Sequence, residues 1–242
     1  MANDLDLFVA NYVDFRFDLH ARIAPRSFPY PPGPKDFSSL PDSLYLNLGD
    51  GTFRDSTLES GIGVVSGPSM GSIAGDFDAD GDSDIFVCCD GAPNHMFVND
   101  GAGHFIEMGV AMGVAMDARG TANGSMGVDA ADLNHDGIDD LLVTDYTRQS
   151  PMLFLSLAPG IYEDAAYRTR VGTEVMPHVN WSPGLVDFDN DGDADAFFCN
   201  GHFLKKATEL EPVTAFAVPN SVMENLGQGR FRSVTSSAGS AL

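Results

Sequence analysis

The chain has few positive charges, few cysteines and no long apolar run, and each shortage excludes a class of protein. Its 242 residues include 13 Lys+Arg against 35 Asp+Glu, a formal net charge of -22. A field of this sign repels phosphate backbones and anionic lipids, so we expect neither a nucleic-acid partner nor insertion into a membrane. Three cysteines supply no disulfide framework, and no stretch of about 18 apolar residues is present to span a bilayer.

One acidic segment occurs three times in the chain. The copies are SMGSIAGDFDADGDSDIFVCCD from Ser69, SMGVDAADLNHDGIDDLLVTDY from Ser125 and NWSPGLVDFDNDGDADAFFCNG from Asn180. Their last loop aspartates, Asp84, Asp140 and Asp195, are 56 and then 55 residues apart. Gly-rich turns flanked by apolar and aromatic residues alternate with these segments. They read NLGDGTF from Asn47, NDGAGHF from Asn99, SLAPGIY from Ser156 and NLGQGRF from Asn225.

This repeat predicts the fold class. Each unit supplies about four short strands, one on either side of the acidic loop and one on either side of the Gly-rich turn. Such a repeat favours an all-β propeller of four-stranded blades over a solenoid, because calcium-binding β-roll coils have a far shorter period. We expect about four blades, an incomplete one over residues 1–60 and then 61–115, 116–172 and 173–242.

Both ends of the chain are expected to lie inside a repeat. Asp6-Leu-Phe-Val matches Asp84-Ile-Phe-Val, so Asp6 is interpreted as the last residue of a truncated metal loop. The chain stops at Leu242, just short of the place where the spacing predicts another acidic loop. The sequence therefore predicts a fragment whose natural partners include the missing blades of the same chain.

Two insertions are predicted between the second and third strands of a blade, on the face opposite the acidic loops. Residues 14–43 form a Pro-rich insertion, expected to be a stiff and extended excursion, and residues 203–219 form the second. The prolines of residues 14–43 are Pro25, Pro29, Pro31, Pro32, Pro34 and Pro41. A helical turn or two is expected only near Lys205–Glu211.

The acidic segment places oxygen ligands at alternating positions, in the pattern Asp-x-Asp/Asn-x-Asp-Gly-x-x-Asp. Positions 1, 3 and 5 direct oxygens inward, the glycine permits the sharp turn, position 7 offers its backbone carbonyl and position 9 closes the shell. The predicted metal ligands are Asp76, Asp78, Asp80, Asp82 and Asp84 in the first loop, Asp132, Asn134, Asp136, Ile138 and Asp140 in the second, and Asp187, Asp189, Asp191, Asp193 and Asp195 in the third.

The chemistry of these loops favours calcium. An all-oxygen set in a flexible loop with six or more ligands suits Ca²⁺ better than Mg²⁺. An EF-hand is excluded, because it needs a Glu at position 12 and flanking helices, whereas a β-rich apolar run starts directly after position 9. Without an ion, the clustered carboxylates would repel one another. We therefore expect three intact Ca²⁺ sites, each stabilising the turn between the first two strands of a blade.

A candidate ligand face lies at the other end of the strands. Polar residues stand about five positions after the last loop aspartate, where the second strand leaves toward the insertions. We hypothesise a polar binding site built from Asn11, Asp145, Asn200 and His202. The alternative is that these are strand-end turn residues that bond their own backbone.

The repeats resemble the FG-GAP/VCBS repeats of integrin-like propellers. More narrowly, three stretches are similar to the ASPIC/UnbV-type, cartilage acidic protein-like family. These are MGVDAADLNHDGIDDLLVTDY, WSPGLVDFDNDGDADAFFCNGH and PNSVMENLGQGRFRSVTSSAGSAL. The resemblance implies a propeller of seven or a similar number of blades, calcium at the matching loops, export from the cytoplasm, and an ASPIC domain after the blades. The turn SLAPGIY departs from the usual Asn-x-Gly-x-Gly-x-Phe.

Taken together, these features favour a calcium-binding module that is extracellular, periplasmic or on the cell surface, and that binds a protein or a glycan, as in adhesion. Two alternatives stay open. One is a carbohydrate-active lyase or hydrolase built on a calcium propeller, and the other is a scaffold for a missing C-terminal ASPIC domain. Nothing in the sequence resembles a Ser-His-Asp triad, a zinc spacing or a P-loop, so binding is preferred to catalysis and no catalytic residue is assigned.

Overall fold

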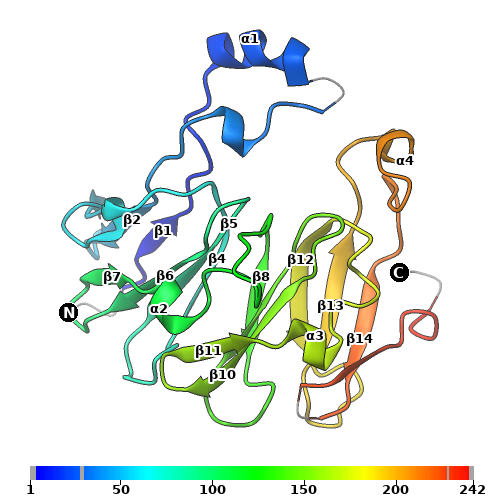
Figure 1. Cartoon of the computed structure of the whole chain (residues 1–242). Coiled ribbons are helices and arrows are strands. Elements are labelled where there is room, and N and C mark those ends of the chain that lie inside the picture. The colour runs from blue at the N-terminus through cyan, green and yellow to red at the C-terminus, as the bar shows by residue number, and fades with distance from the viewer. Residues whose placement is uncertain (1–3, 28–29, 228, 240–242) are drawn as a thin grey trace.

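The structure is a computed structural model that describes residues 4–27, 30–227 and 229–239. Within these residues the strands form four antiparallel sheets, each with its strands in sequence order (Figure 1). One sheet has three strands and the other three have four. This arrangement confirms the predicted all-β fold built from propeller blades. The predicted blade boundaries at residues 1–3 and 240–242 lie outside the described residues.

The strands alternate regularly with the acidic loops and the Gly-rich turns. The first blade contains β1 (Leu7–Val9), β2 (Ser43–Asn47) and β3 (Phe53–Asp55). The second contains β4 (Ser69–Gly75), β5 (Asp84–Cys89), β6 (His95–Asn99) and β7 (Phe105–Glu107). The third contains β8 (Val128–Ala131), β9 (Asp140–Val143), β10 (Met152–Ala158) and β11 (Ile161–Asp164). The fourth contains β12 (Asn180–Val186), β13 (Asp195–Asn200), β14 (Ser221–Asn225) and β15 (Phe231–Ser233).

Short helical pieces connect the blades or lie within the insertions. They are α1 (Phe17–Ser27), η1 (Pro34–Asp36), η2 (Ile62–Val64), α2 (Gly109–Met112), α3 (Ala166–Thr169) and α4 (Ala207–Leu210). In the described part of the chain, none of the helices has the length and apolar character that crossing a membrane requires.

The middle strands are buried on both faces, which explains their unbroken apolar runs. Along β5 the side chains alternate between two cores. Phe86 and Cys88 join the core between the second and third blades, while Ile85 and Val87 join the core shared with the first blade. A third core lies between the third and fourth blades and includes Leu142, which alternates in the same way on β9. The blades are therefore held face to face by apolar packing, in the manner of a propeller.

The innermost strands approach one another closely at two glycines. A Cβ atom at Gly71 would lie 2.6 Å from the carbonyl oxygen of Met126, and one at Gly127 would lie 2.4 Å from that of Trp181. The Gly71 N–H donates to the Met126 carbonyl at 2.8 Å. Since only glycine lacks a Cβ, the residue after Ser-Met in two repeats is required by the contact between neighbouring blades.

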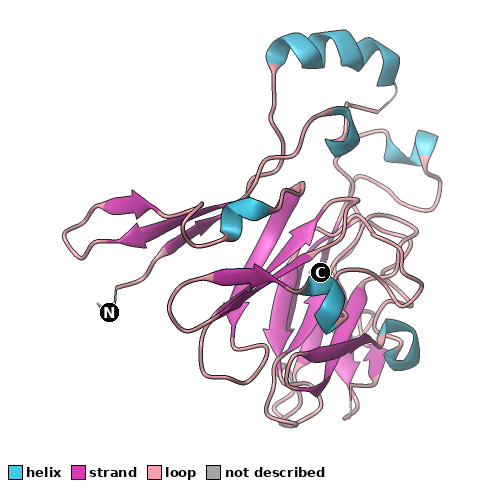
Figure 2. Ribbon diagram, turned by 60° about the vertical axis from the view of Figure 1, so that its left-hand side comes forward, coloured by secondary structure: helices cyan, strands magenta, loops and turns pink. Residues whose placement is uncertain are grey.

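Both insertions leave their blades between the second and third strands and extend from the same end of the molecule (Figures 1 and 2). The helix α4 lies in the second insertion, where a turn or two of helix was expected. The extended conformation predicted for residues 14–43 is wrong in part, because α1 occupies its first half. Residues 17–24 contain no proline, so a helix can form before the prolines begin, and only Pro25 falls in its last turn. Pro29 lies outside the described residues.

Candidate functional site

The three acidic loops connect β4 to β5, β8 to β9 and β12 to β13, and they share one backbone geometry. Position 4 of each loop has a left-handed conformation, with φ of 60° at Ala79, 60° at His135 and 64° at Asn190. The glycine at position 6 also has positive φ, from 88° to 100°. This pair of unusual residues turns the chain sharply, so that positions 1, 3 and 5 lie on the inside of the loop.

The carboxylate at position 1 holds the loop by accepting backbone N–H groups. Asp76 accepts from Asp80 through Oδ1 and from Gly81 through Oδ2, both at 3.0 Å. Asp132 and Asp187 make the same two contacts in their loops. The side chain at position 3 accepts from the position 5 N–H, and the side chain at position 5 accepts from the position 7 N–H, in all three loops. The side chains at positions 1, 3 and 5 therefore face the inside of their loops, where they accept backbone N–H groups.

Both carboxylate oxygens of the aspartate at position 9 accept backbone N–H groups. Asp140 accepts the Leu133 N–H at 2.8 Å through Oδ2 and the Ser156 N–H at 2.7 Å through Oδ1. Asp84 and Asp195 make the equivalent pairs of bonds. Asp6 likewise accepts the Asn47 N–H at 2.8 Å, as a residue at position 9 should. This aspartate ties the acidic loop to the third strand of its blade, a role that the sequence reasoning did not assign to it.

Two loops gather three carboxylates each within metal-binding reach. Ligand oxygens of Asp76, Asp78 and Asp84 all lie within 4.8 Å of one another, and so do those of Asp187, Asp189 and Asp195. In the second loop, Asn134 stands at position 3 and offers a neutral amide oxygen instead.

Burial and mutual repulsion perturb these carboxyl groups. Desolvation raises the pKa of Asp140 to about 7, and it raises the pKa of Asp84. Desolvation and then the neighbouring Asp80 raise the pKa of Asp78. Such groups gain most from a bound cation, which compensates for both causes. The donor set, made only of oxygens, fits the predicted Ca²⁺.

Position 7 does not turn its side chain into the loop. Ile138 packs in the core between the second and third blades. Asp193 Oδ1 lies 2.7 Å from His135 Nε2, in the neighbouring acidic loop. These orientations of Ile138 and Asp193 are compatible with a ligand role for the position 7 carbonyl rather than the position 7 side chain.

The asparagine that opens the Gly-rich turn supports the acidic loop, a role that the sequence reasoning missed. Asn99 Nδ2 donates to the Ser83 carbonyl at 3.1 Å, and Asn225 Nδ2 donates to the Ala194 carbonyl at 3.1 Å. Both acceptors occupy position 8. The third turn has Ser156 instead, and there the Tyr162 hydroxyl lies 3.2 Å from the position 8 carbonyl of Asp139. The departure of SLAPGIY from the repeat is therefore compensated by a phenol from the next strand.

The proposed ligand face is not one site. Asn11 Nδ2 donates to the Pro41 carbonyl at 2.8 Å and to Ser43 Oγ at 3.1 Å, and Asn200 makes the equivalent bonds to Pro219 and Ser221. Each amide therefore ties the end of the second strand of its blade to the start of the third strand, across the insertion, and does not bond its own local backbone. Asp145 and His202 are buried, at 0% and 3% exposure.

His202 belongs to a polar network that joins the two insertions. The Leu204 N–H donates to His202 Nδ1 at 2.9 Å, so the ring proton of the neutral histidine is on Nε2, which lies 3.0 Å from the Tyr146 hydroxyl. Tyr146 in turn donates to Glu211 at 3.1 Å, and Tyr30 donates to the same carboxylate oxygen at 3.0 Å. The carboxylate thus links the Pro-rich insertion to the second insertion.

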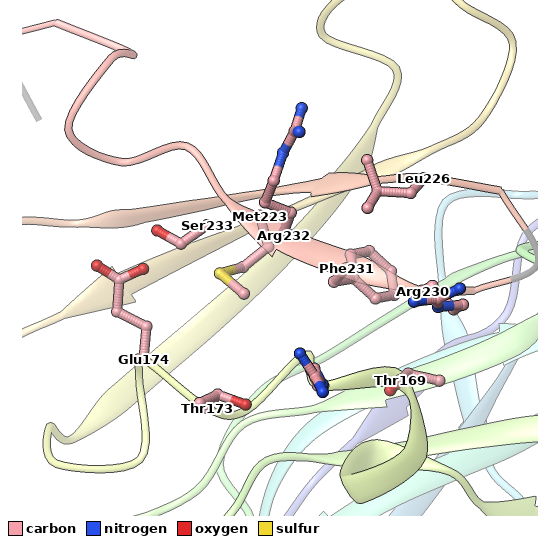
Figure 3. A pocket seen from close by; sticks show the side chains of 10 residues that line it. Thr169, Thr173, Glu174, Met223, Leu226, Arg230, Phe231, Arg232 and Ser233 are labelled. Atoms are coloured by element: carbon pink, nitrogen blue, oxygen red, sulfur yellow. The ribbon is translucent and has the colours of Figure 1, made fainter.

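Two open clefts of about 350 Å³ lie outside the acidic loops. The first lies between η1 and the second and third blades, at the end of the molecule that carries the insertions. Its lining includes Lys35, Asp90, Ala122, Tyr146 and Gln149. The second lies beside the fourth blade, where Thr169 and Glu174 face Met223, Arg230 and Phe231 (Figure 3).

Comparison with known proteins assigns the repeats to a family. The model of the FG-GAP-like repeat matches residues 3–87 and 76–143, which together exceed half of the chain. The chain belongs to the FG-GAP-like repeat family. No curated protein matches it.

Among solved structures, one that is similar is that of an Agrocybe aegerita lectin, described as specifically recognising non-reducing terminal N-acetylglucosamine. It is 21% identical, with a TM-score of 0.40, and the match covers 81% of this chain and 46% of the lectin. The chain therefore corresponds to less than half the length of that lectin. A likeness at this score assigns no ligand.

Proposed function

We propose that this chain is a calcium-stabilised propeller module that binds a glycan or a protein on the face carrying its two insertions. The observation that carries the proposal is that the two ends of the blades hold different features. One end holds the acidic loops, whose side chains are occupied in holding the turns. The other end carries both insertions, joined through Glu211, together with the cleft lined by Tyr146 and Lys35.

The lining of this cleft suits a polar ligand with apolar patches. The Tyr146 ring offers an apolar surface beside the amide of Gln149, the carboxylate of Asp90 and the ammonium of Lys35. An aromatic ring with a few polar groups around it is a common arrangement for recognising sugars or peptide side chains. Lys35 is one of only 13 basic residues in a chain of net charge -22, so its place in this lining favours a ligand with an acidic or electron-rich group.

Calcium has a structural role in this proposal. Three sites are expected, built from the inward-facing side chains at positions 1, 3 and 5, the carbonyl at position 7 and the carboxylate at position 9. Loops of this kind suit an environment with abundant calcium, and modest affinity is enough there. We therefore place the module outside the cytoplasm. Within it, the four blades over residues 1–60, 61–115, 116–172 and 173–242 would act as one unit.

A binding experiment with a matched control tests the ligand face. Ala122→Trp fills the cleft and Lys35→Ala removes its cation, while Arg230→Ala removes a cation from the second cleft. Each variant is first checked for unchanged thermal unfolding. On an array of glycans and peptides, we expect the first two to weaken binding of a captured ligand about tenfold, a loss typical of one good contact, and Arg230→Ala to bind as wild type. Unchanged binding by Ala122→Trp would show that the cleft is not the site.

A further inference from the structure

A group of poorly paired buried polar atoms lies where the third and fourth blades meet, at the end opposite the acidic loops. The carboxylate of Asp145 is buried, and its hydrogen-bonding neighbour among the described residues is the Asn123 side-chain amide, which lowers its pKa as a hydrogen-bond partner although the geometry is poor. Ser125 Oγ and Asn180 Oδ1 are buried and have no hydrogen-bond partner within the described part of the chain. The four residues are between 0% and 3% exposed. Buried polar atoms are almost always well paired, so a cluster of poorly satisfied oxygens around a buried carboxylate calls for a partner that is not a protein group.

The backbone brings these residues together. The Asn180 N–H donates to the Asp145 carbonyl at 3.1 Å, and the Thr144 hydroxyl donates to the Trp181 carbonyl at 3.2 Å, so the end of β9 lies against the start of β12. The Met126 N–H donates to the Thr144 carbonyl at 3.0 Å, which places Ser125 beside Asp145 on the other side.

The second and fourth blades contain residue pairs equivalent to Ser125 and Asp145 of the third blade. In the second blade, the equivalent residues Ser69 and Cys89 are register partners, with Oγ and Sγ 3.9 Å apart. In the fourth blade, Asn180 and Asn200 are partners, and Asn180 Nδ2 donates to Asn200 Oδ1 at 2.8 Å. Only the third of these three blades places a carboxylate at this position.

The surroundings of Asp145 are negative. No lysine, arginine or histidine forms an ion pair with it among residues 4–27, 30–227 and 229–239. Desolvation raises the pKa of Asp145 well above its usual value, the nearby Asn123 amide offsets part of this, and the carboxylates of Asp164, Asp117 and Asp90 raise the pKa further. A buried carboxylate in such a field is compensated either by a proton or by a cation.

We propose that Asp145, Ser125 and Asn180 hold a hard cation at this junction, a site distinct from the three acidic loops. The donors are a carboxylate, a hydroxyl and an amide oxygen. Hard cations such as Ca²⁺ and Na⁺ take such all-oxygen sets. The ion would join the third blade to the fourth, and this inference stands independently of any ligand on the insertion face.

The test compares wild type with Asp145→Asn, which keeps the shape of the side chain and removes its charge. With calcium in excess, ion counting by native mass spectrometry should find one Ca²⁺ fewer in the variant if the site takes a divalent ion. If the site takes a monovalent ion, the unfolding temperature of wild type should be higher in sodium chloride than in choline chloride of equal ionic strength. The unfolding temperature of the variant should be the same in both salts. Asp132→Asn serves as the reference for loss of a loop ion, and Asp14→Asn, at an exposed aspartate, controls for charge removal.

Two results would overturn the proposal. If Asp145→Asn matches wild type in ion count and in its response to sodium, the carboxyl group is simply protonated and no cation is held there. Should that variant fail to fold, Ser125→Ala replaces it, because this change removes one neutral donor and leaves the charge. We expect Ser125→Ala to weaken binding of the same cation about tenfold. Unchanged cation affinity in Ser125→Ala would overturn the proposal equally.

Discussion

The hydroxyl of Tyr162 lies 2.9 Å from the carbonyl oxygen of Phe77, although the two residues belong to different blades. Phe77 follows position 1 of the first acidic loop, and Tyr162 lies on β11 of the third blade. The same hydroxyl is 3.2 Å from the Asp139 carbonyl in the second acidic loop. One buried phenol therefore links two acidic loops and joins the second blade to the third.

Removing this hydroxyl should weaken the junction between the blades. Tyr162→Phe removes the hydroxyl that bonds the Phe77 and Asp139 carbonyls, and the Phe77 carbonyl keeps the Gly160 N–H at 3.3 Å, so the free energy of unfolding should fall by about 1 kcal/mol. Urea unfolding measures the change. Tyr167→Phe is the control, because Tyr167 is 99% exposed and its hydroxyl is free to bond water. Equal stability of Tyr162→Phe and wild type would mean that the contact contributes nothing.

Two aspartates of one acidic loop should respond differently to calcium. Asp195 is buried and accepts two backbone N–H groups, so Asp195→Asn leaves one donor facing an amide NH₂ and should cost about 1–3 kcal/mol even in a chelator. Asp191 is exposed at position 5, and Asp191→Asn should mainly weaken calcium binding. Chemical unfolding with and without calcium separates the two effects. The expectation fails if both variants lose stability only when calcium is present.

Calcium itself should stabilise the fold. Since the ion binds the folded loops and not the unfolded chain, the unfolding temperature should rise as calcium is added to the chelated protein. Asp132→Asn should bind one ion fewer than wild type, because it removes one charge at position 1 of the second loop. Calorimetry and ion counting check these outcomes. No rise in unfolding temperature at millimolar calcium would contradict the metal assignment.

Stability should fall in mild acid partly because of His95. Desolvation lowers the pKa of His95 from its usual 6.5, so the unfolded chain binds a proton more readily than the folded one. The stabilisation that comes from keeping this ring neutral is complete above about pH 6.5 and is lost as the pH falls through the lowered pKa. The stability difference between wild type and His95→Gln should therefore shrink from about pH 7.5 to 5. His104→Gln, at an exposed side chain, should show no such trend, and a parallel trend in both variants would dissociate the effect from burial.

The repeat made much of the fold predictable. Spacing alone located the three loops, because a nine-residue pattern with fixed carboxylates and a glycine has few structural solutions. The placement of both insertions followed from counting strands. By contrast, the helix α1 was missed, because the number of prolines in residues 14–43 concealed their clustering in the second half of the segment.

The ligand face was harder to predict because its residues act through tertiary contacts. Asn11, Asn200 and Asp145 occupy one repeat position, yet the two amides bond the start of the next strand, whereas Asp145 is a buried carboxylate without an ion-pair partner among the described residues. Sequence position does not distinguish an amide that finds backbone acceptors from a carboxylate that lacks a charged donor. Likewise, nothing in SLAPGIY indicated that Tyr162 would replace the missing asparagine, because the two groups reach the same carbonyl from different strands.

The hydrogen bonds that hold each blade together at its acidic-loop end have a practical consequence for engineering. The position 9 aspartate joins the loop to the third strand at that end, whereas the opposite hairpin already accommodates both the Pro-rich insertion and residues 203–219 without disturbing strand register. The two insertions themselves are thus the natural segments to replace with a foreign peptide. A propeller of this type is a display scaffold with one variable rim, and new recognition loops can be exchanged there while the calcium loops stay unchanged.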